Sequence, residues 1–333
     1  MEPGRFFPLG TSPAVRVSVL VVRRSLTCVL VALACCGAPA PGPNPHLVQK
    51  RTRSAAALGD LSGLEPSLRR AFAAHPEDFP ALADPGPDDW LTVHPELPQA
   101  VDIFRASKPN VPGAGGRDRL YIQPLGEVEN IETLRAFASD FFQMPVVVRP
   151  PLPLADVEVQ RRDFGGTEQL RAPDLLHLLQ ETLPADAYAL IGLTMADLYP
   201  GEDHNFVFGY ASTRHRTGVF SLARYADSPP RAQERAFKVL AHEFGHMFGI
   251  HHCVHNACVM NGVNHVEELD RAPLALCPVC LRKLHLLLGF DPAPRYEALR
   301  EHYDAAGLTA AEAFVDLRLQ RITAPSSRPW PPP

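Results

Sequence analysis

One nineteen-residue stretch, HEFGHMFGIHHCVHNACVM, constrains most strongly what this chain can fold into. It runs from His242 to Met260 and contains five histidines and two cysteines. His242 and His246 are four residues apart, so on a helix both side chains lie on one face and can bind one ion. Glu243 lies about 100° round the helix from His242, where it can hold a water molecule rather than bind the metal.

A glycine and a further histidine complete the motif. Gly249 lets the helix end and the chain turn, which brings His252 back as a third ligand. Three neutral imidazoles leave a fourth position for water, whose pKa Zn²⁺ lowers to about 7, so Glu243 can accept its proton. The full pattern, His-Glu-x-x-His-x-x-Gly-x-x-His, is that of the metzincins and predicts a catalytic zinc site. His251 competes as third ligand, but the motif's spacing favours His252.

Met260 follows the third histidine of the motif closely in the sequence. Metzincins place a methionine in a tight turn beneath the three histidines, where its apolar thioether forms a floor. The other interpretation is an ordinary methionine of the core. We interpret His255 and His265 as loop residues or as hydrogen-bond partners of the ligands.

Four of the seven cysteines form a second cluster just after the motif. Cys253 directly follows His252, and neighbours in an extended chain point to opposite sides, so the two residues can face different ions. The spacing C-x4-C with a later C-x2-C predicts a closed, tetrahedral structural zinc site. A redox-active CPVC pair and disulfides remain as alternatives. The four cysteines are Cys253, Cys258, Cys277 and Cys280.

The charge and the N-terminal residues bear on partners and location. The formal net charge is −5 and no basic run occurs, so we expect no nucleic-acid partner. Leu26–Ala38 is an apolar run after two arginines; it has the length of a signal-peptide core and is too short to span a membrane. Cysteines clustered beside histidines favour the cytoplasm, while Leu26–Ala38 leaves secretion or anchoring open. The sequence does not specify an oligomeric state.

Strand and helix patterns alternate up to the motif, which predicts an α/β fold, a sheet packed by helices. We expect strands at 119–126, 144–150, 186–199, 205–212 and 218–225, and helices at 58–75, 130–143, 172–183, 231–249 and 278–290. The 186–199 strand is apolar on both faces and should be central. We divide the chain into a leader (1–57), an N-terminal helical extension (58–112), a catalytic domain (113–290), and C-terminal helices with a proline-rich tail (291–333).

The motif followed by CPVC resembles the archaemetzincins. The stretches DDWLTVHPELPQ, GLTMADLYP and NFVFGYAS also look like vertebrate members, and the resemblance covers about residues 60–300. It implies a metzincin-like zincin domain with a twisted mixed sheet, a zinc-stapled loop segment, two zinc ions and aminopeptidase-like activity. By position it implies these roles: zinc ligands His242, His246 and His252; general base Glu243; turn methionine Met260; and second-site ligands Cys253, Cys258, Cys277 and Cys280.

The sequence thus predicts a zinc metallopeptidase that acts on peptide substrates. The alternative is a catalytically silent, zinc-stabilised binding or regulatory protein, whose mark would be a lost base or ligand; none is lost here. A strand at the cleft, 205–212 or 218–225, should align the peptide by strand addition. An exopeptidase also needs an acidic group for the free amine of the substrate, and the candidates are Asp197, Glu202 and Asp203.

Overall fold

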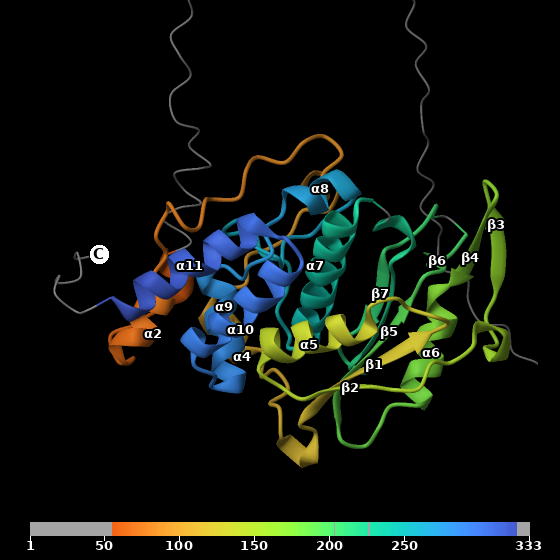
Figure 1. Cartoon of the computed structure of the whole chain (residues 1–333), viewed down its shortest axis with the longest axis horizontal. Coiled ribbons are helices and arrows are strands. Elements are labelled where there is room, and N and C mark those ends of the chain that lie inside the picture. Colours follow the sequence, from red (N-terminus) through yellow and green to blue (C-terminus); the bar gives the residue numbers. More distant parts are fainter. Residues whose placement is uncertain (1–54, 203, 226, 325–333) are drawn as a thin grey trace, which may run out of the picture. The chain divides into compact units, whose positions relative to one another are not determined.

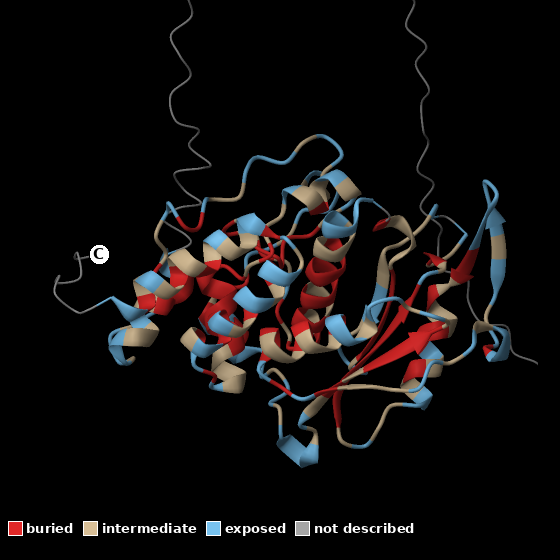
Figure 2. Ribbon diagram, in the orientation of Figure 1, coloured by how far each residue is buried: buried red, intermediate tan, exposed pale blue. Residues whose placement is uncertain are grey.

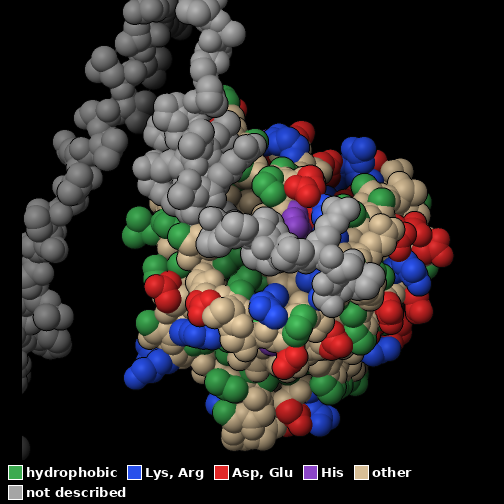
Figure 3. Space-filling view, turned by 90° about the vertical axis from the view of Figure 1, so that its left-hand side faces the viewer, with side chains coloured by type: hydrophobic (Ala, Val, Ile, Leu, Met, Phe, Trp, Pro, Cys, Tyr) green, Lys and Arg blue, Asp and Glu red, His purple; other side chains and the backbone are tan. Residues whose placement is uncertain are grey.

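The computed structural model describes residues 55–202, 204–225 and 227–324. Residues 1–54 of the expected leader, which include Leu26–Ala38, lie outside these residues, as do residues 325–333 and Asp203. Residues 55–57, which we also assigned to the leader, are helical, and Ala57 is buried in the core. Among the helices of the described ranges, none is long and apolar enough to cross a membrane. On the face shown in Figure 3, acidic and basic side chains are interspersed with apolar ones.

A five-stranded mixed sheet forms the centre of the fold (Figure 1). The strand order is β2-β1-β5-β8-β7; four strands are parallel, and β7 runs antiparallel to β8 at one edge. The strands are β1 (Arg119–Leu125), β2 (Val146–Val148), β5 (Ala187–Thr194), β7 (Gly209–Ser212) and β8 (Thr217–Ser221). The predicted α/β fold, with a mixed sheet packed by helices, is confirmed.

The central strand β5 is buried along its whole length. Ile191 belongs to the core shared with α5 (Ile131–Phe142) and α7 (Pro229–Met247), while Leu190 packs with leucines of α6 (Ala172–Glu181). Successive side chains of a strand point to opposite faces, so β5 needs apolar residues at every position. The prediction of a central strand here is confirmed, although a second strand, β6 (Asp197–Tyr199), takes up the end of the predicted range.

Helix α7 carries the histidine motif and is buried along most of its length (Figure 2). Prolines occupy its first turn, where the missing N–H groups cost no hydrogen bond. The helix ends before Gly249, whose φ of +78° lies in the left-handed region that the sequence analysis expected for the turn. Its buried apolar row has helical spacing: Phe237, Leu240, Ala241, Phe244 and Met247.

A smaller three-stranded sheet lies at the end of the fold marked by β3 in Figure 1. It pairs β3 (Arg161–Phe164) with β4 (Thr167–Arg171) in an antiparallel hairpin, and β4 with β6 in parallel. The sequence analysis did not predict this hairpin. Its residues are mostly polar and exposed, so they lack the alternating apolar pattern that marks a half-buried strand.

The N-terminal and C-terminal parts of the described chain share one core. Helix α2 (Pro66–Ala71) packs against α11 (Thr309–Thr323), and α10 (Pro292–Ala305) packs against α5. The predicted helix at 58–75 is wrong in length, because Asp60 accepts a turn hydrogen bond from the Ser62 N–H and the helix begins only at Pro66. The remaining helices near the site are α3 (Trp90–Val93), α4 (Val101–Ala106), α8 (Val266–Arg271) and α9 (Pro278–Leu288).

Candidate metal centre

Three histidines from α7 and the following loop meet at one point. The Nε2 atoms of His242 and His246 lie 2.9 Å apart, and one ring nitrogen from each of these residues and His252 lies within 4.8 Å of the others. The alternative, His251, is exposed, and its backbone N–H donates to Gln99 Oε1. The structure therefore brings together the three histidines that the motif selected.

The second nitrogen of each ring fixes which nitrogen faces the centre. Each Nδ1 donates to an oxygen acceptor, so the proton is on Nδ1 and the Nε2 lone pair is free to bind a metal. Two lone pairs facing each other at 2.9 Å repel, whereas in a tetrahedral zinc site such nitrogens lie about 3.3 Å apart around the ion. The donor set therefore fits zinc. The pairs are His242 with Val259 O (2.9 Å), His246 with Ile250 O (2.7 Å) and His252 with Glu96 Oε1 (2.6 Å).

Burial keeps the histidines of α7 neutral. Desolvation lowers the pKa of His246 to about 3, with a further contribution from His252, and holds the pKa of His242 well below its usual value. Neutral imidazole is the form that binds zinc, so no proton has to leave before an ion enters.

Glu243 lies on α7 next to the histidines without joining their cluster. Its half-buried side chain lines the same cavity, and burial raises its pKa to about 8. A cation bound to the histidines would instead lower the pKa of Glu243, because a nearby positive charge favours the ionised carboxylate. The Glu243 carboxyl group therefore faces the same cavity as the histidines.

Met260 is fully buried directly against α7. A Cβ atom placed on Gly245 would lie 2.4 Å from Met260 Sδ, so the methionine occupies the space that a larger residue in the helix would need. Its carbonyl accepts a hydrogen bond from the Cys253 N–H at 2.7 Å. The structure therefore places the methionine beside the helix turn that carries His242 and His246.

The four cysteines form a second, fully enclosed cluster. Their Sγ atoms all lie within 4.8 Å of one another, and those of Cys253 and Cys277 are 3.6 Å apart. In a tetrahedral site with zinc–sulfur bonds of about 2.3 Å, sulfurs are about 3.8 Å apart, whereas a disulfide requires about 2.05 Å. All four are free thiols here. The spacing therefore fits a zinc ion and not the disulfide alternative.

The environment of the cysteines also favours a cation. Hydrogen bonds from the other three thiols hold the pKa of Cys253 well below its usual value, whereas burial raises the pKa values of Cys258 and Cys277. Without an ion, the cluster can therefore hold only part of the negative charge that four thiolates carry. A zinc ion would supply the missing compensation, since its ligands are thiolates.

A cavity of about 470 Å³ opens beside the histidines. Its lining includes the segment from His204 to Gly209, which leads into the edge strand β7, and residues of the segment between Cys258 and Cys277. Tyr225, near the start of α7, also lines it; its buried hydroxyl has no hydrogen-bond partner among the described residues. The edge strand β7 therefore contributes to the lining of this cavity through Gly209.

A second hollow of about 440 Å³ lies on the other side of the centre. His246 and His252 line both hollows, so the histidine cluster lies between them. Among the described residues that line the two hollows, Glu243 and Glu96 are the acidic ones. A peptide bond at the histidines would therefore have two cavities of similar volume next to it, one lined by Glu243 and the other by Glu96.

Comparison with known proteins identifies the family. The chain is 33% identical to human archaemetzincin-2 over 306 residues, which covers 77% of this chain and 84% of that protein. The chain belongs to the archaemetzincin family. Residues 179–286 match the sequence profile of peptidase family M54, and the resemblance noted in the sequence is confirmed. Archaemetzincins are zinc metallopeptidases, and the histidine cluster and the cysteine cluster of this chain are both groups that could hold a metal ion.

Other members match at similar identity but with different coverage of the two chains. Rat archaemetzincin-1 is 32% identical, with 70% of this chain and 55% of that protein covered. The solved archaemetzincin of Archaeoglobus fulgidus, complexed with malonate, is 31% identical with a TM-score of 0.43; the match covers 50% of this chain and 99% of that one. The solved archaemetzincin of Methanopyrus kandleri gives the same identity and TM-score.

Two of the three acidic residues proposed from sequence for an amine site, Asp197 and Glu202, do not line the cavities of this archaemetzincin. The Asp197 carboxylate is buried and accepts two hydrogen bonds from Arg224, at 2.8 and 2.7 Å. Glu202 is exposed near Arg162 and lines neither hollow. Asp203 lies outside the described residues. The sequence proposal for Asp197 was wrong, because a strand-end position did not reveal its arginine partner.

Sequence reasoning missed two residues at the centre, Trp90 and Glu96. Trp90 lines the cavity of about 470 Å³ beside the histidines. Its ring packs edge-on against His252, with ring centroids 5.0 Å apart. Glu96 accepts the His252 hydrogen bond, although the two are 156 positions apart in sequence. The signal available was the archaemetzincin-like stretch DDWLTVHPELPQ, which carries no metal-binding pattern.

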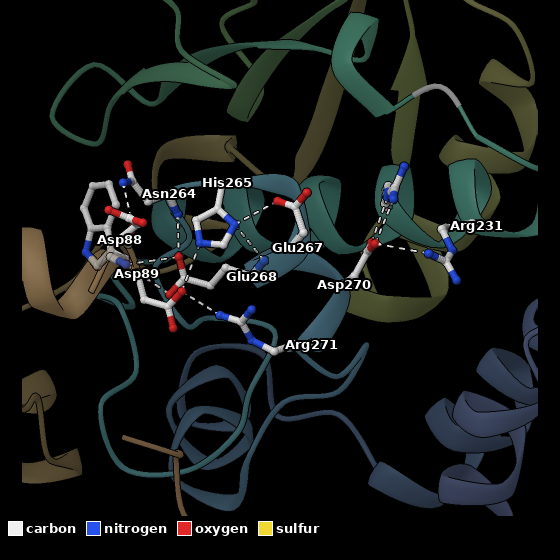
Figure 4. Close-up of polar contacts among 11 residues, drawn as sticks. Asp88, Asp89, Arg231, Asn264, His265, Glu267, Glu268, Asp270 and Arg271 are labelled. Atoms are coloured by element: carbon white, nitrogen blue, oxygen red, sulfur yellow. Dashed lines mark hydrogen bonds and ion pairs between the residues drawn. The ribbon is translucent and has the colours of Figure 1, made fainter. Parts of the chain in front are cut away.

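A third acidic and histidine group holds this N-terminal stretch in place (Figure 4). Asp89 accepts from Arg271 at 2.6 Å and contacts His265 at 3.0 Å, while the Glu268 carboxylate accepts from the Trp90 N–H and the Asn264 N–H. The oxygens are therefore satisfied by protein donors, and Arg271 already supplies a positive charge. We interpret this group, the α8 clasp, as a structural contact and not as a metal site.

Proposed function

We propose that this archaemetzincin hydrolyses peptide bonds at a zinc ion held by His242, His246 and His252, and that a second, structural zinc is held by the four cysteines. The observation that carries the proposal is the convergence of three Nε2 lone pairs beside a carboxylate in a cleft. A bound zinc ion would supply a Lewis acid that polarises the scissile carbonyl and acidifies water. The structural site would join the loop after α7 to the start of α9.

Glu243 performs the proton transfers in this proposal. As a carboxylate it accepts a proton from the attacking water, and then donates that proton to the leaving amine. The raised pKa of about 8 that burial gives this group helps it to hold the proton between the two steps. The water oxygen forms a bond to the carbonyl carbon, the peptide C–N bond breaks, and the leaving amine takes the proton that the water lost, so the products are a carboxyl group and a free amine.

The edge strand β7 is the better of the two candidates for binding the peptide. Strand β8 is paired on both sides, by β5 and β7, so it has no free edge. The Ser221 N–H donates to Phe208 O, and hydrogen-bonded pairs alternate along an antiparallel ladder, so Gly209 turns its backbone groups to the open edge. Gly209 also lines the cleft. A substrate strand can therefore add to β7 beside the histidines.

We propose an aminopeptidase-like preference on the basis of the different linings of the two cavities. The ammonium group of a substrate with a single residue before the scissile bond would find the Glu96 carboxylate in the second hollow. The rest of the peptide would occupy the cavity lined by Gly209 of β7. If this is right, peptides with a free N-terminus should lose their first residue, and the same peptides acetylated at the N-terminus should not be cut. Cleavage of acetylated peptides at internal bonds would show an endopeptidase instead.

Replacement of Glu243 tests the hydrolytic role directly. Glu243→Gln keeps the shape of the side chain but removes the base, so we expect zinc content to stay and hydrolysis to fall at least about 100-fold, the typical contribution of general-base catalysis. Zinc should be measured by elemental mass spectrometry and activity on a free-amine peptide. Equal background activity of wild type and variant would leave only the silent, zinc-stabilised alternative.

The zinc-to-protein ratio tests the second site. Two donor clusters predict a ratio near two in protein purified without added metal. A ratio near one, with fewer than four titratable thiols among the clustered cysteines, would favour oxidised cysteines. We propose the cytoplasm as the location, since thiolate zinc sites persist in a reducing compartment.

A further inference from the structure

The loop that delivers the third histidine is braced by a segment far upstream, Trp90–Gln99. Gln99 is buried, donates to Gly249 O at 3.1 Å, and accepts from the His251 N–H at 3.1 Å. Lys283 from α9 donates to the same side-chain oxygen at 2.9 Å. The turn after α7 is therefore held by the Gln99 side chain, which binds two residues just before His252.

Glu96 in the same segment reaches the histidine itself. Its Oε1 atom accepts from His252 Nδ1 at 2.6 Å and from Trp90 Nε1 at 2.5 Å. The side chains of Glu96 and His252 are 23% and 19% exposed, so water competes only weakly for these hydrogen bonds. An ionised carboxylate can only accept, which forces the His252 proton onto Nδ1.

Trp90 fixes the carboxylate in turn. The backbone N–H of Trp90 is bound by Glu268 of the α8 clasp at 3.0 Å, and its ring packs on His252 and His94. Rotation of the carboxylate would break the Trp90 Nε1 hydrogen bond as well as that of His252. The chain of contacts therefore runs from α8 through Trp90 and Glu96 to the histidine.

We propose that Glu96 is a positioning residue of the metal centre: it sets the tautomer and orientation of His252 and so strengthens zinc binding. This inference rests on the proposed zinc site. The other two histidines donate Nδ1 to backbone carbonyls, which any sequence can supply, whereas His252 depends on one side chain. Residue 96 lies outside the range matched by the family profile, so the upstream segment adds a partner that the core motif does not contain.

The test measures zinc affinity of the full chain by competition with a chromogenic chelator. His246→Ala removes a proposed ligand, so the zinc that wild type holds and this variant lacks defines the histidine site. Glu96→Ala should weaken zinc at that site about 10- to 100-fold, the usual effect of losing an outer hydrogen-bond partner. Glu96→Gln keeps an acceptor oxygen without the charge, so its zinc affinity should lie between those of wild type and Glu96→Ala. Asp102→Asn, the control, removes an exposed carboxylate of α4 and should leave the zinc affinity unchanged.

The zinc affinities of these variants either support or overturn the role of Glu96. If Glu96→Ala or, should it not fold, Glu96→Gln binds zinc within twofold of wild type, Glu96 is only a packing residue and the inference is overturned. A purely structural role would lower the melting temperature and leave the zinc affinity unchanged. If wild type and His246→Ala hold equal zinc, the proposed zinc site itself has failed, and the Glu96 inference falls with it.

Discussion

At the scale of single residues, the centre depends on contacts that leave no space for extra atoms. Gly245 stands on α7 between the two histidines, and Met260 Sδ fills the position of its missing side chain. Glycine in a helix interior costs about 1 kcal/mol relative to alanine, so the position is unfavourable for the helix alone. The close approach of the methionine explains why the position needs glycine.

Gly245→Ala should therefore destabilise the protein although alanine favours the helix. Overpacking costs about 1–3 kcal/mol, which exceeds the gain in helix propensity, so we expect a net loss of about 1 kcal/mol in the free energy of unfolding. Urea denaturation measures it. In a Met260→Ala background the added methyl group has room, and Gly245→Ala should then stabilise. A loss of equal size in both backgrounds would show that the two residues are not coupled.

At the scale of elements, the spacing of apolar residues in the sequence predicted helices well where one face of the helix is buried. It did not predict the parts of the fold that are held by polar contacts. The helix at 130–143 and the motif helix at 231–249 were predicted close to α5 and α7, because apolar residues recur at helical spacing. The α8 clasp could not be predicted, since its partners lie about 180 positions apart and are joined by polar contacts.

The α8 clasp should make stability depend on pH. Burial alone would lower the pKa of His265, but hydrogen bonds to Glu267 and Asp89 and the nearby charge of Glu268 outweigh it, and the pKa is raised. The protonated histidine therefore adds stability that is fully present below about pH 6.5 and is lost as the pH rises through the raised pKa.

His265→Gln tests this dependence. The difference in unfolding free energy between wild type and variant should be larger at pH 6 than at pH 9, because the wild type loses the charge on His265 over that range. Chemical denaturation at the two pH values gives the comparison. A difference that stays constant with pH would mean that the histidine acts in the clasp only as a neutral hydrogen-bonding group.

At the scale of the whole molecule, a buried ion pair joins the last described helix, α11, to the segment that follows α2. Arg318 of α11 and Asp78 have no exposed side-chain surface, and Arg318 also donates to the carbonyls of Arg70 and Ala71 at the end of α2. The sequence showed the helices but not their pairing, because neither residue has a local partner. The cleft residues lie between 90 and 272, so the C-terminal helices stabilise the fold without lining the two hollows.

Arg318→Met should be strongly destabilising. Removing one partner of a buried pair costs about 3–5 kcal/mol, and the Arg321 that also contacts Asp78 places this case near the lower value. Arg300→Met is the matched control, since its pair with Asp316 is exposed and worth at most about 1 kcal/mol. Thermal and urea unfolding of both variants measure the difference. Equal effects would show that burial of the Asp78 pair adds nothing.

The distance in sequence between the Trp90 segment and its partners has a consequence for the protein as it is made. Trp90 and Glu268 are 178 positions apart. At about 5–20 residues per second, Trp90 leaves the ribosome roughly 10–35 s before Glu268 does. During that interval the early segment has no docking surface, and the histidine site has only part of its surroundings. A nascent chain of this kind therefore cannot form its complete cleft, and cannot act on its neighbours through it, until most of the polypeptide has been synthesised.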